Sequence, residues 1–552
     1  MRIQLKNVTE KSLKRKVRKE YGLLILSLFF VAILYILVWK RNGIHLAGND
    51  DYTLMASMAG FNTGVPEAKS LYSGFLWGKI VSGLYQWNAA VAWYPLVFCI
   101  LIYISLVCIC YSILCIFSEK WEWLWGTAIF LILYFGIFWN VTIELQFTTV
   151  AAICGSAVIA NIITHKRIVS RVGKLCNIFV SGVLFLMAYN IRVEVGYLLI
   201  SCMILIFLIE VAAKGLNRKN AAGFLLCFFA MLLISVVSEH LTDVKYGWMD
   251  YRQFRVALSQ FIDYSHPDFD EYQSEYEEIG WSKEVYQMAE KWCFLDETIN
   301  YDNLVKINGL APQREKIDIK EVIGTLSASG RVNFQMIIWL FFVVMYCIVE
   351  KDRKNVFMRG IFPFMAFGGE ILLLAMRGRL PYRVSESLVI LFCVAGILEM
   401  LQSKKAAEKQ VYIMIFVGMA GTCLMNKVET SAYVNNTSLK ALEVYAMKNK
   451  DNLYIHNSVW SGESFTVYPD EKPSNLMFWG GGEKYSPLYY EQLHINGLDE
   501  LNTEELFASN VYYIDTNMHN EYFFEYMTWK YPECTYQVVE EEPGFVVYKF
   551  DN

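Results

Sequence analysis

The chain has 552 residues, of which 55% are hydrophobic and 16% aromatic, with a net charge of −5 at pH 7 and a mean hydropathy of +0.31. A water-soluble protein of this length cannot bury so much apolar surface, so most of that surface is expected to face lipid. No basic domain stands out in the sequence, which argues against a nucleic-acid partner.

Apolar segments long enough to cross a bilayer as helices recur along the chain. About eleven are expected, near residues 21–39, 91–117, 123–139, 145–163, 175–190, 195–213, 221–238, 333–350, 356–376, 385–401 and 410–425. The first follows a basic stretch and lacks a small-residue cleavage site, so it is expected to be a signal anchor rather than a cleaved signal.

Lysine and arginine alternate from loop to loop between these segments. The predicted inner loops carry Lys166, Arg167, Arg171, Lys174, Lys214, Arg218, Lys219, Lys351, Arg353, Lys354, Arg359, Lys404, Lys405 and Lys409. Basic loops stay on the cytoplasmic side. The sequence therefore predicts an all-α polytopic bundle in the cell membrane, with the N-terminus inside and the C-terminus outside.

Three larger regions are expected outside the membrane. Residues 41–90 should form juxtamembrane helices, and residues 240–331 form an acidic segment rich in Tyr and Trp. The tail favours a small α/β domain: a helix at 439–448, strands at 453–456 and 511–514, and a hairpin of 536–539 with 545–549 turned by Pro543-Gly544. The predicted organisation is a bundle over 1–429, with outer loops 41–90 and 240–331, and an extracytoplasmic α/β domain over 430–552.

The pair Asp50-Asp51 lies shortly after the first span, at the predicted outer surface. Such a pair often forms a turn or a helix N-cap. Ionised groups near the membrane plane are nevertheless costly unless they are paired or used. Adjacent carboxylates suit a general base or a site for a divalent cation such as Mg²⁺ or Mn²⁺.

Arg377, Arg379 and Arg383 cluster on one short loop that the topology places outside, against the positive-inside bias. They could pair with lipid head groups or with the acidic segment. A sharper interpretation is a phosphate clamp, because arginine offers bidentate donors that are always charged. Glu386, three residues after Arg383, could be its helical ion-pair partner.

Arg192 and Glu194 interrupt an apolar stretch between two predicted spans. Charges so placed usually face the interior of a bundle or a water-filled cavity. The two could form a structural ion pair or contribute to a site. Glu144, at a predicted outer mouth, is a weaker candidate for the same cavity. Cys293 and Cys534 lie in long polar regions, and the sequence leaves their pairing open.

This arrangement resembles the GT-C superfamily of membrane glycosyltransferases, which use sugars linked to polyprenyl phosphate. The resemblance rests on the basic N-terminus before one span, on Asp50-Asp51 at the start of the first outer loop, on the multi-span bundle, and on the outer α/β tail. The stretch from Gly378 to Arg383 is also similar to one in uncharacterised many-span proteins of bacterial surface-polysaccharide loci. The Trp-Trp-Asp signature of the oligosaccharyltransferase branch is missing from the sequence.

The resemblance implies an activity on the outer face of the membrane. An acidic residue of the first outer loop, Asp50 or Asp51, would act as base or metal ligand while a sugar moves from its lipid phosphate to an envelope glycan or lipid acceptor. Arg192, Arg377, Arg379 or Arg383 would bind the phosphate, with Glu144, Glu194 and Glu386 in supporting roles. Two alternatives remain: a polysaccharide polymerase or ligase of the O-antigen type, and a transporter or flippase.

Overall fold

The computed structural model describes residues 2–47, 50–118, 121–213, 217–264, 266–310, 320, 323–324, 330–376, 380–403, 437–457, 473–479, 483–516 and 520–552. These form two compact units. The first is made of residues 1–47, 95–237 and 317–433, and the second of residues 48–94, 238–316 and 434–552. Each unit therefore gathers segments that lie far apart in the sequence.

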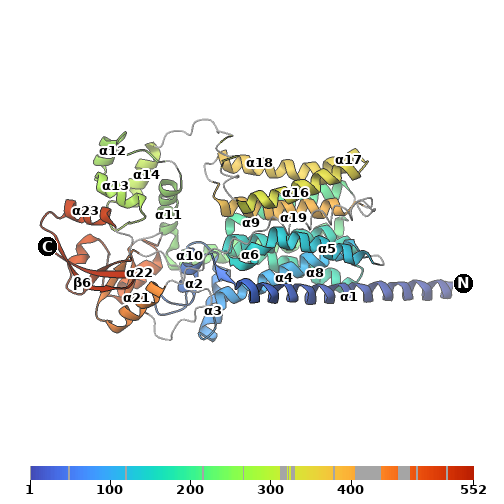
Figure 1. The fold of residues 1–552 in the computed structure, drawn as a ribbon, viewed down its shortest axis with the longest axis horizontal. Helices are drawn as coiled ribbons and strands as arrows, with labels where there is room; N and C mark the ends of the chain where they lie inside the picture. Colours follow the sequence, from blue (N-terminus) through green and yellow to red (C-terminus); the bar gives the residue numbers. More distant parts are fainter. Residues whose placement is uncertain are drawn as a thin grey trace. The chain divides into compact units, whose positions relative to one another are not determined.

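The first unit is a bundle of long apolar helices (Figure 1). Its helices are α1 (Arg2–Asn42), α4 (Trp93–Ile116), α5 (Glu122–Leu133), α6 (Trp139–Ile143), α7 (Phe147–Thr164), α8 (Arg171–Ile191), α9 (Val193–Ala212), α10 (Arg218–Tyr246), α16 (Gly330–Val349), α17 (Arg353–Asn355), α18 (Phe362–Met376) and α19 (Tyr382–Leu401). A two-residue parallel pair, β1 (His45–Leu46) with β2 (Glu144–Leu145), joins the end of α1 to the turn before α7.

Ten helices of the described residues are long and apolar enough to cross a membrane. They match ten of the predicted spans, so the expectation of a multi-pass membrane protein is confirmed. The predicted span at 410–425 lies outside the described residues. Two spans contain a short π-helical segment, η1 (Tyr134–Phe138) and η3 (Val356–Ile361). Such π-bulges insert an extra residue without ending a helix, and η1 joins α5 and α6 into one span over 122–143.

Helices α7 and α19 form the centre of the bundle. Every residue of α7 is buried, and α19 is buried from Ser385 to Leu401. Gly155 on α7 allows this packing, because a Cβ there would lie 2.8 Å from Leu391 of α19. The outer helices instead expose apolar side chains, as α1 does with Phe29 and Ile33. This distribution is the one expected when lipid covers the outside of the bundle.

Buried charges inside the bundle form one network. Glu210 on α9 and Glu399 on α19 are fully buried. The Lys166 ammonium lies 2.9 Å from both carboxylate oxygens of Glu210. The Arg359 guanidinium lies 2.5 Å from Glu399 and 3.8 Å from Glu210. Two carboxylates are thus neutralised by two cations, which ties the ends of four helical segments together.

Removing one partner of this network should destabilise the bundle. Arg359→Ala leaves Glu399 buried without its cation, so we expect a loss of about 3 kcal/mol or more of unfolding free energy. Arg353→Ala, at an exposed position of α17, is the matched control and should change little. The melting temperatures of both variants are measured by heating the detergent-solubilised protein and analysing it by fluorescence-detected size exclusion. Equal melting temperatures for the two variants would contradict a stabilising role.

The second unit combines helices from three segments with a sheet. Its helices are α2 (Asp50–Met58), α3 (Phe75–Trp87), α11 (Trp248–Asp263), α12 (Gln273–Glu278), α13 (Lys283–Glu290), α14 (Tyr301–Leu310), α21 (Thr437–Lys448), α22 (Pro487–Ile495) and α23 (Glu521–Lys530). Helices α2 and α3 occupy the segment in which the sequence predicts juxtamembrane helices. One hydrophobic cluster includes residues of the acidic segment, such as Trp281, and of the tail, such as Tyr513, so these segments share a core.

The sheet has five strands in the order β4-β3-β5-β7-β6. Its strands are β3 (Leu453–His456), β4 (Leu476–Phe478), β5 (Val511–Asp515), β6 (Thr535–Glu542) and β7 (Phe545–Asp551). Strands β4, β3 and β5 are parallel, whereas β7 runs antiparallel to β5 and β6. The predicted hairpin is confirmed: Glu542 pairs with Phe545, and Gly544 adopts φ +107°, a conformation that favours glycine. The tail therefore has the expected mixture of helices and strands, within a unit that also contains residues 48–94 and 238–316.

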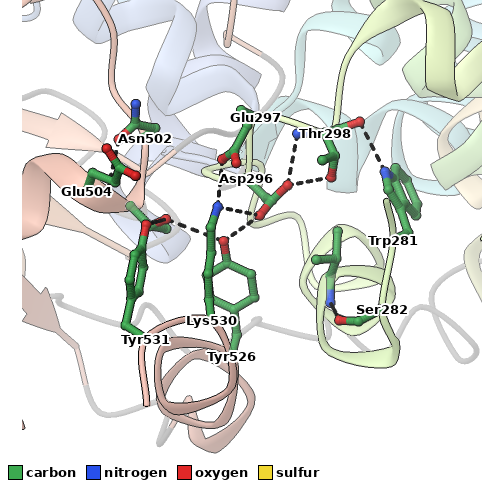
Figure 2. Close-up of polar contacts among 12 residues, drawn as sticks. Trp281, Ser282, Asp296, Glu297, Thr298, Asn502, Glu504, Tyr526, Lys530 and Tyr531 are labelled. Atoms are coloured by element: carbon green, nitrogen blue, oxygen red, sulfur yellow. Dashed lines mark hydrogen bonds and ion pairs between the residues drawn. The ribbon is translucent and has the colours of Figure 1, made fainter. Parts of the chain in front are cut away.

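Asp296 is the centre of a polar network that ties the acidic segment to α23 (Figure 2). One carboxylate oxygen accepts hydrogen bonds from the amide and the hydroxyl of Thr298. The other accepts from the Tyr526 hydroxyl at 2.5 Å and from the Lys530 ammonium at 3.0 Å. Burial raises the pKa of Asp296, but the bonds from Thr298 and Tyr526 and the charge of Lys530 outweigh burial, so the pKa lies below its usual value. The ionised form therefore stabilises this unit.

Loss of this carboxylate should loosen the link between the acidic segment and α23. Asp296→Ala removes several charge-assisted hydrogen bonds, and we expect local stability to fall by about 2–4 kcal/mol. Glu297→Ala removes only a surface ion pair with Lys530 and should cost less than about 1 kcal/mol. Hydrogen exchange of residues 291–300 and 521–531 in the full chain reports both changes.

The same network has a defined pH dependence. A carboxylate whose pKa is depressed by folding contributes stability above its unfolded pKa, and that stability is lost as the pH falls through the folded pKa. The protection factors of residues 521–531, which correct for the intrinsic exchange rate at each pH, should therefore fall below about pH 4 in the wild type. Asp296→Ala should lack this acid-dependent step, and an identical step in the variant would show that other groups cause it.

Candidate active site

The acidic dyad opens a helix of the second unit. Asp50 and Asp51 form the first turn of α2, where the partial positive charge of a helix N-terminus favours carboxylates. Asp51 is buried, and its Oδ1 accepts a hydrogen bond from the Tyr94 hydroxyl at 3.0 Å. Asp50 is only half-buried. The two adjacent carboxylates thus differ in burial.

Arg255 on α11 supplies a cation in the same unit. Its Nη2 donates to the Tyr72 hydroxyl at 3.4 Å, and its guanidinium lies over the rings of Tyr72 and Trp292 at 5.4 and 6.0 Å. Burial lowers the pKa of Arg255, but Tyr72, Tyr251, Asp263 and Asp50 outweigh burial and raise the pKa above its usual value. The contribution of Asp50 is the smallest of these four.

One hydrogen-bond donor of Arg255 has no partner among the described residues. Within the part of the chain that the structure describes, its Nη1 is buried and has no hydrogen-bond partner. An unused donor on a buried guanidinium is costly. An anionic oxygen such as that of a phosphate would satisfy it, because arginine binds phosphate with several donors at once.

A cluster of four charges holds the segment between α2 and α3 against α11. The Lys69 ammonium pairs with Glu239, and it lies 3.0 Å from Asp243. Arg252 of α11 contacts the same two carboxylates at 2.7 and 2.5 Å. Glu239 also accepts from the backbone amide of Phe75 at 2.7 Å. The cluster therefore fixes the first outer segment to the helix that carries Arg255.

Breaking this cluster should disorder the first outer segment. Lys69→Met leaves Asp243 buried with a single cation, and we expect a local destabilisation of about 2 kcal/mol. Lys79→Met, an exposed position on α3, removes the same charge and should be neutral. Limited proteolysis of the full chain in detergent measures the effect, and equal cleavage rates within residues 59–74 would argue against a fixing role.

The predicted residues of the first unit have partners of their own. Arg192 forms a 2.8 Å ion pair with Glu194 and lies over the Phe147 ring at 5.0 Å, at the bend between α8 and α9. Glu386 is buried in α19, where its Oε1 accepts from Gln335 at 3.3 Å. Glu144 stands in β2, opposite His45. These contacts bring Arg192 and Glu194 together, and their roles in a site stay predictions.

The arginine cluster is described only in part. Arg383 lies in the first turn of α19, whereas Arg377 and Arg379 lie outside the described residues. Cys293 and Cys534 are both free thiols, so the structure holds no disulfide between them. Among the described residues, no group of three or more Asp, Glu, His or Cys side chains is placed to hold a metal ion. Asp50 and Asp51 as metal ligands stay a prediction.

Sequence reasoning missed Arg255 and Lys69. Both are basic residues in segments that the topology predicts to lie outside, where the positive-inside rule makes them exceptions. Arg255 follows Phe254 and lies one turn after the buried Tyr251, on a helix otherwise rich in buried aromatic residues. A basic residue at that position of an amphipathic helix is the sequence signal from which Arg255 could have been predicted.

Comparisons with known proteins add no family assignment. The sequence matches no protein-family model and no curated protein. The chain is similar to the solved structure of ArnT from Cupriavidus metallidurans bound to undecaprenyl phosphate, at 10% identity and a TM-score of 0.43, with 94% of this chain and 97% of that chain covered. For the same protein in the apo state, identity is 10%, the TM-score is 0.42, and 96% and 98% are covered. TM-scores at this level carry no argument about function, so the candidate site rests on the residues of this chain.

Proposed function

We propose that this membrane protein is a glycosyltransferase that moves a sugar from a polyprenyl-phosphate donor to an envelope glycan or lipid acceptor. The observation that supports this proposal is the presence, within the second unit, of a half-buried carboxylate, Asp50, and of a half-buried arginine, Arg255, whose Nη1 is buried and has no hydrogen-bond partner among the described residues. A base and a phosphate-binding cation are the two groups that such a transfer requires.

Asp50 is the general base of this proposal. Its carboxylate takes the proton of an acceptor hydroxyl while that oxygen attacks the anomeric carbon. Asp51, held by Tyr94, keeps the start of α2 in place and adds negative charge beside the base. These two different roles agree with the different environments of the two adjacent carboxylates.

The leaving group is the phosphate of the lipid. As the bond between the anomeric carbon and the phosphate oxygen breaks, negative charge develops on that oxygen. The free Nη1 donor of Arg255 suits this charge, and Arg192, Arg377, Arg379 and Arg383 remain further candidates from the sequence. A lipid-linked donor is delivered at the bilayer surface, which agrees with a site next to the end of a membrane span. The predicted topology puts that site on the extracytoplasmic face.

Neutralising the base should abolish transfer. We expect Asp50→Asn to lower the rate by about 10²-fold or more, which is the range that general-base catalysis contributes. Arg255→Gln should also lower the rate. Arg255→Lys should retain only part of the wild-type rate, because lysine keeps the charge but lacks the planar guanidinium with its several donors. The assay supplies membranes containing the protein with radiolabelled polyprenyl-phosphate sugars and follows label into the acceptor.

Asp250→Asn is the matched control, since it removes an exposed carboxylate from the same unit. Expression and melting temperature of each variant exclude a loss through misfolding. Full activity of Asp50→Asn, together with loss in Arg379→Ala, would favour the polysaccharide polymerase or ligase instead. No transfer from any donor by the wild type would refute the glycosyltransferase.

A further inference from the structure

An open groove runs between α11 and α14 in the second unit, and Arg255 of α11 is not among its lining residues. Its volume is about 530 Å³, which lies within the range of small-molecule sites. The apolar side chains of its lining are exposed to solvent: Val256 is 70% exposed and Val305 is 47% exposed. Tyr301, at the start of α14, is 41% exposed.

The polar part of the lining consists of amides. Gln253 and Gln260 project from α11, and Asn308 comes from α14. The Asn308 amide donates to the backbone carbonyl of Ala257 at 2.8 Å, which fixes α14 against α11. An amide side chain offers two donors and an acceptor together. Such groups match neighbouring hydroxyls, each of which both donates and accepts.

The groove carries no net charge. Among the described residues, Arg252 is the only charged one in its lining, and its guanidinium is bound to Glu239 and Asp243. Those two carboxylates are also paired with Lys69, so the four charges cancel. An anionic or cationic ligand would therefore gain little electrostatic attraction here.

We infer that this groove binds a neutral saccharide unit of the acceptor. The amides suit its hydroxyls, and the open faces of Tyr301 and the two valines suit the apolar C–H face of a sugar ring. A lipid tail would leave the amides without partners, which is unfavourable. The inference rests on the proposed function only where it names the saccharide as the acceptor.

Binding can be tested without any transfer. Detergent-solubilised full-length protein is titrated with cellotetraose, chitotetraose and mannotetraose by saturation-transfer NMR and calorimetry, with tetragalacturonate as the anionic comparison. We expect at least one neutral oligosaccharide to bind, and Gln260→Ala and Tyr301→Ala to weaken its binding by about tenfold or more. Lys306→Ala, an exposed position of α14 outside the groove lining, is the control and should bind as the wild type does.

Several results would overturn the inference: no binding of any neutral oligosaccharide, binding that both groove variants leave unchanged, or tighter binding of tetragalacturonate. The transfer assay separates this outcome from a failure of the proposed function. Where transfer occurs, Gln260→Ala should raise KM for the acceptor and leave kcat unchanged, whereas Asp50→Asn should lower kcat and retain oligosaccharide binding. If Gln260→Ala catalyses transfer with an unchanged KM, the proposed enzyme activity would hold, but the groove would have no part in acceptor binding.

Discussion

The pairing of buried charges is the constraint on which both units depend. An ion taken out of water is costly unless an opposite charge and hydrogen bonds replace the lost solvation. In the bundle, Lys166 and Arg359 neutralise Glu210 and Glu399, so helices that would otherwise expose a charge to lipid can close together. In the second unit, Lys69 and Arg252 do the same for Glu239 and Asp243. Each network joins elements from distant parts of the chain.

The candidate site differs in its pairing from the Asp296 network. Asp296 accepts hydrogen bonds on both oxygens from protein groups, so it has a structural role (Figure 2). Arg255, by contrast, retains a buried donor with no partner in the described part of the chain, and Asp50 is half-buried beside the buried Asp51. A buried donor held without a partner is tolerated most readily where a ligand completes it. This contrast separates the groups proposed for chemistry from those that hold the fold.

Local patterns in the sequence predict a large part of this structure. Ten predicted spans match helices, because about twenty consecutive apolar residues leave a chain in a bilayer few alternatives to a helix. The strands at 453–456 and 511–514 and the Pro543-Gly544 hairpin are equally local, since alternation and turn chemistry specify them within a few residues. The acidic dyad was likewise visible from its position after the first span. The sequence could not show which of the two carboxylates is buried, because the burial of Asp51 depends on Tyr94, which lies more than forty residues away.

The sequence by itself therefore determined the membrane class, the spans, the small α/β tail and the Asp50-Asp51 pair, since each follows from the residues of one short segment. Only the tertiary structure decided that residues 48–94, 238–316 and 434–552 form one unit. It also decided that Lys69 and Arg252 share two carboxylates. The contacts of Lys69 join residues at least 170 positions apart. Such partners are selected by the packing of whole elements and by the cost of leaving a charge unpaired, and neither can be seen in the spacing of residues along the chain.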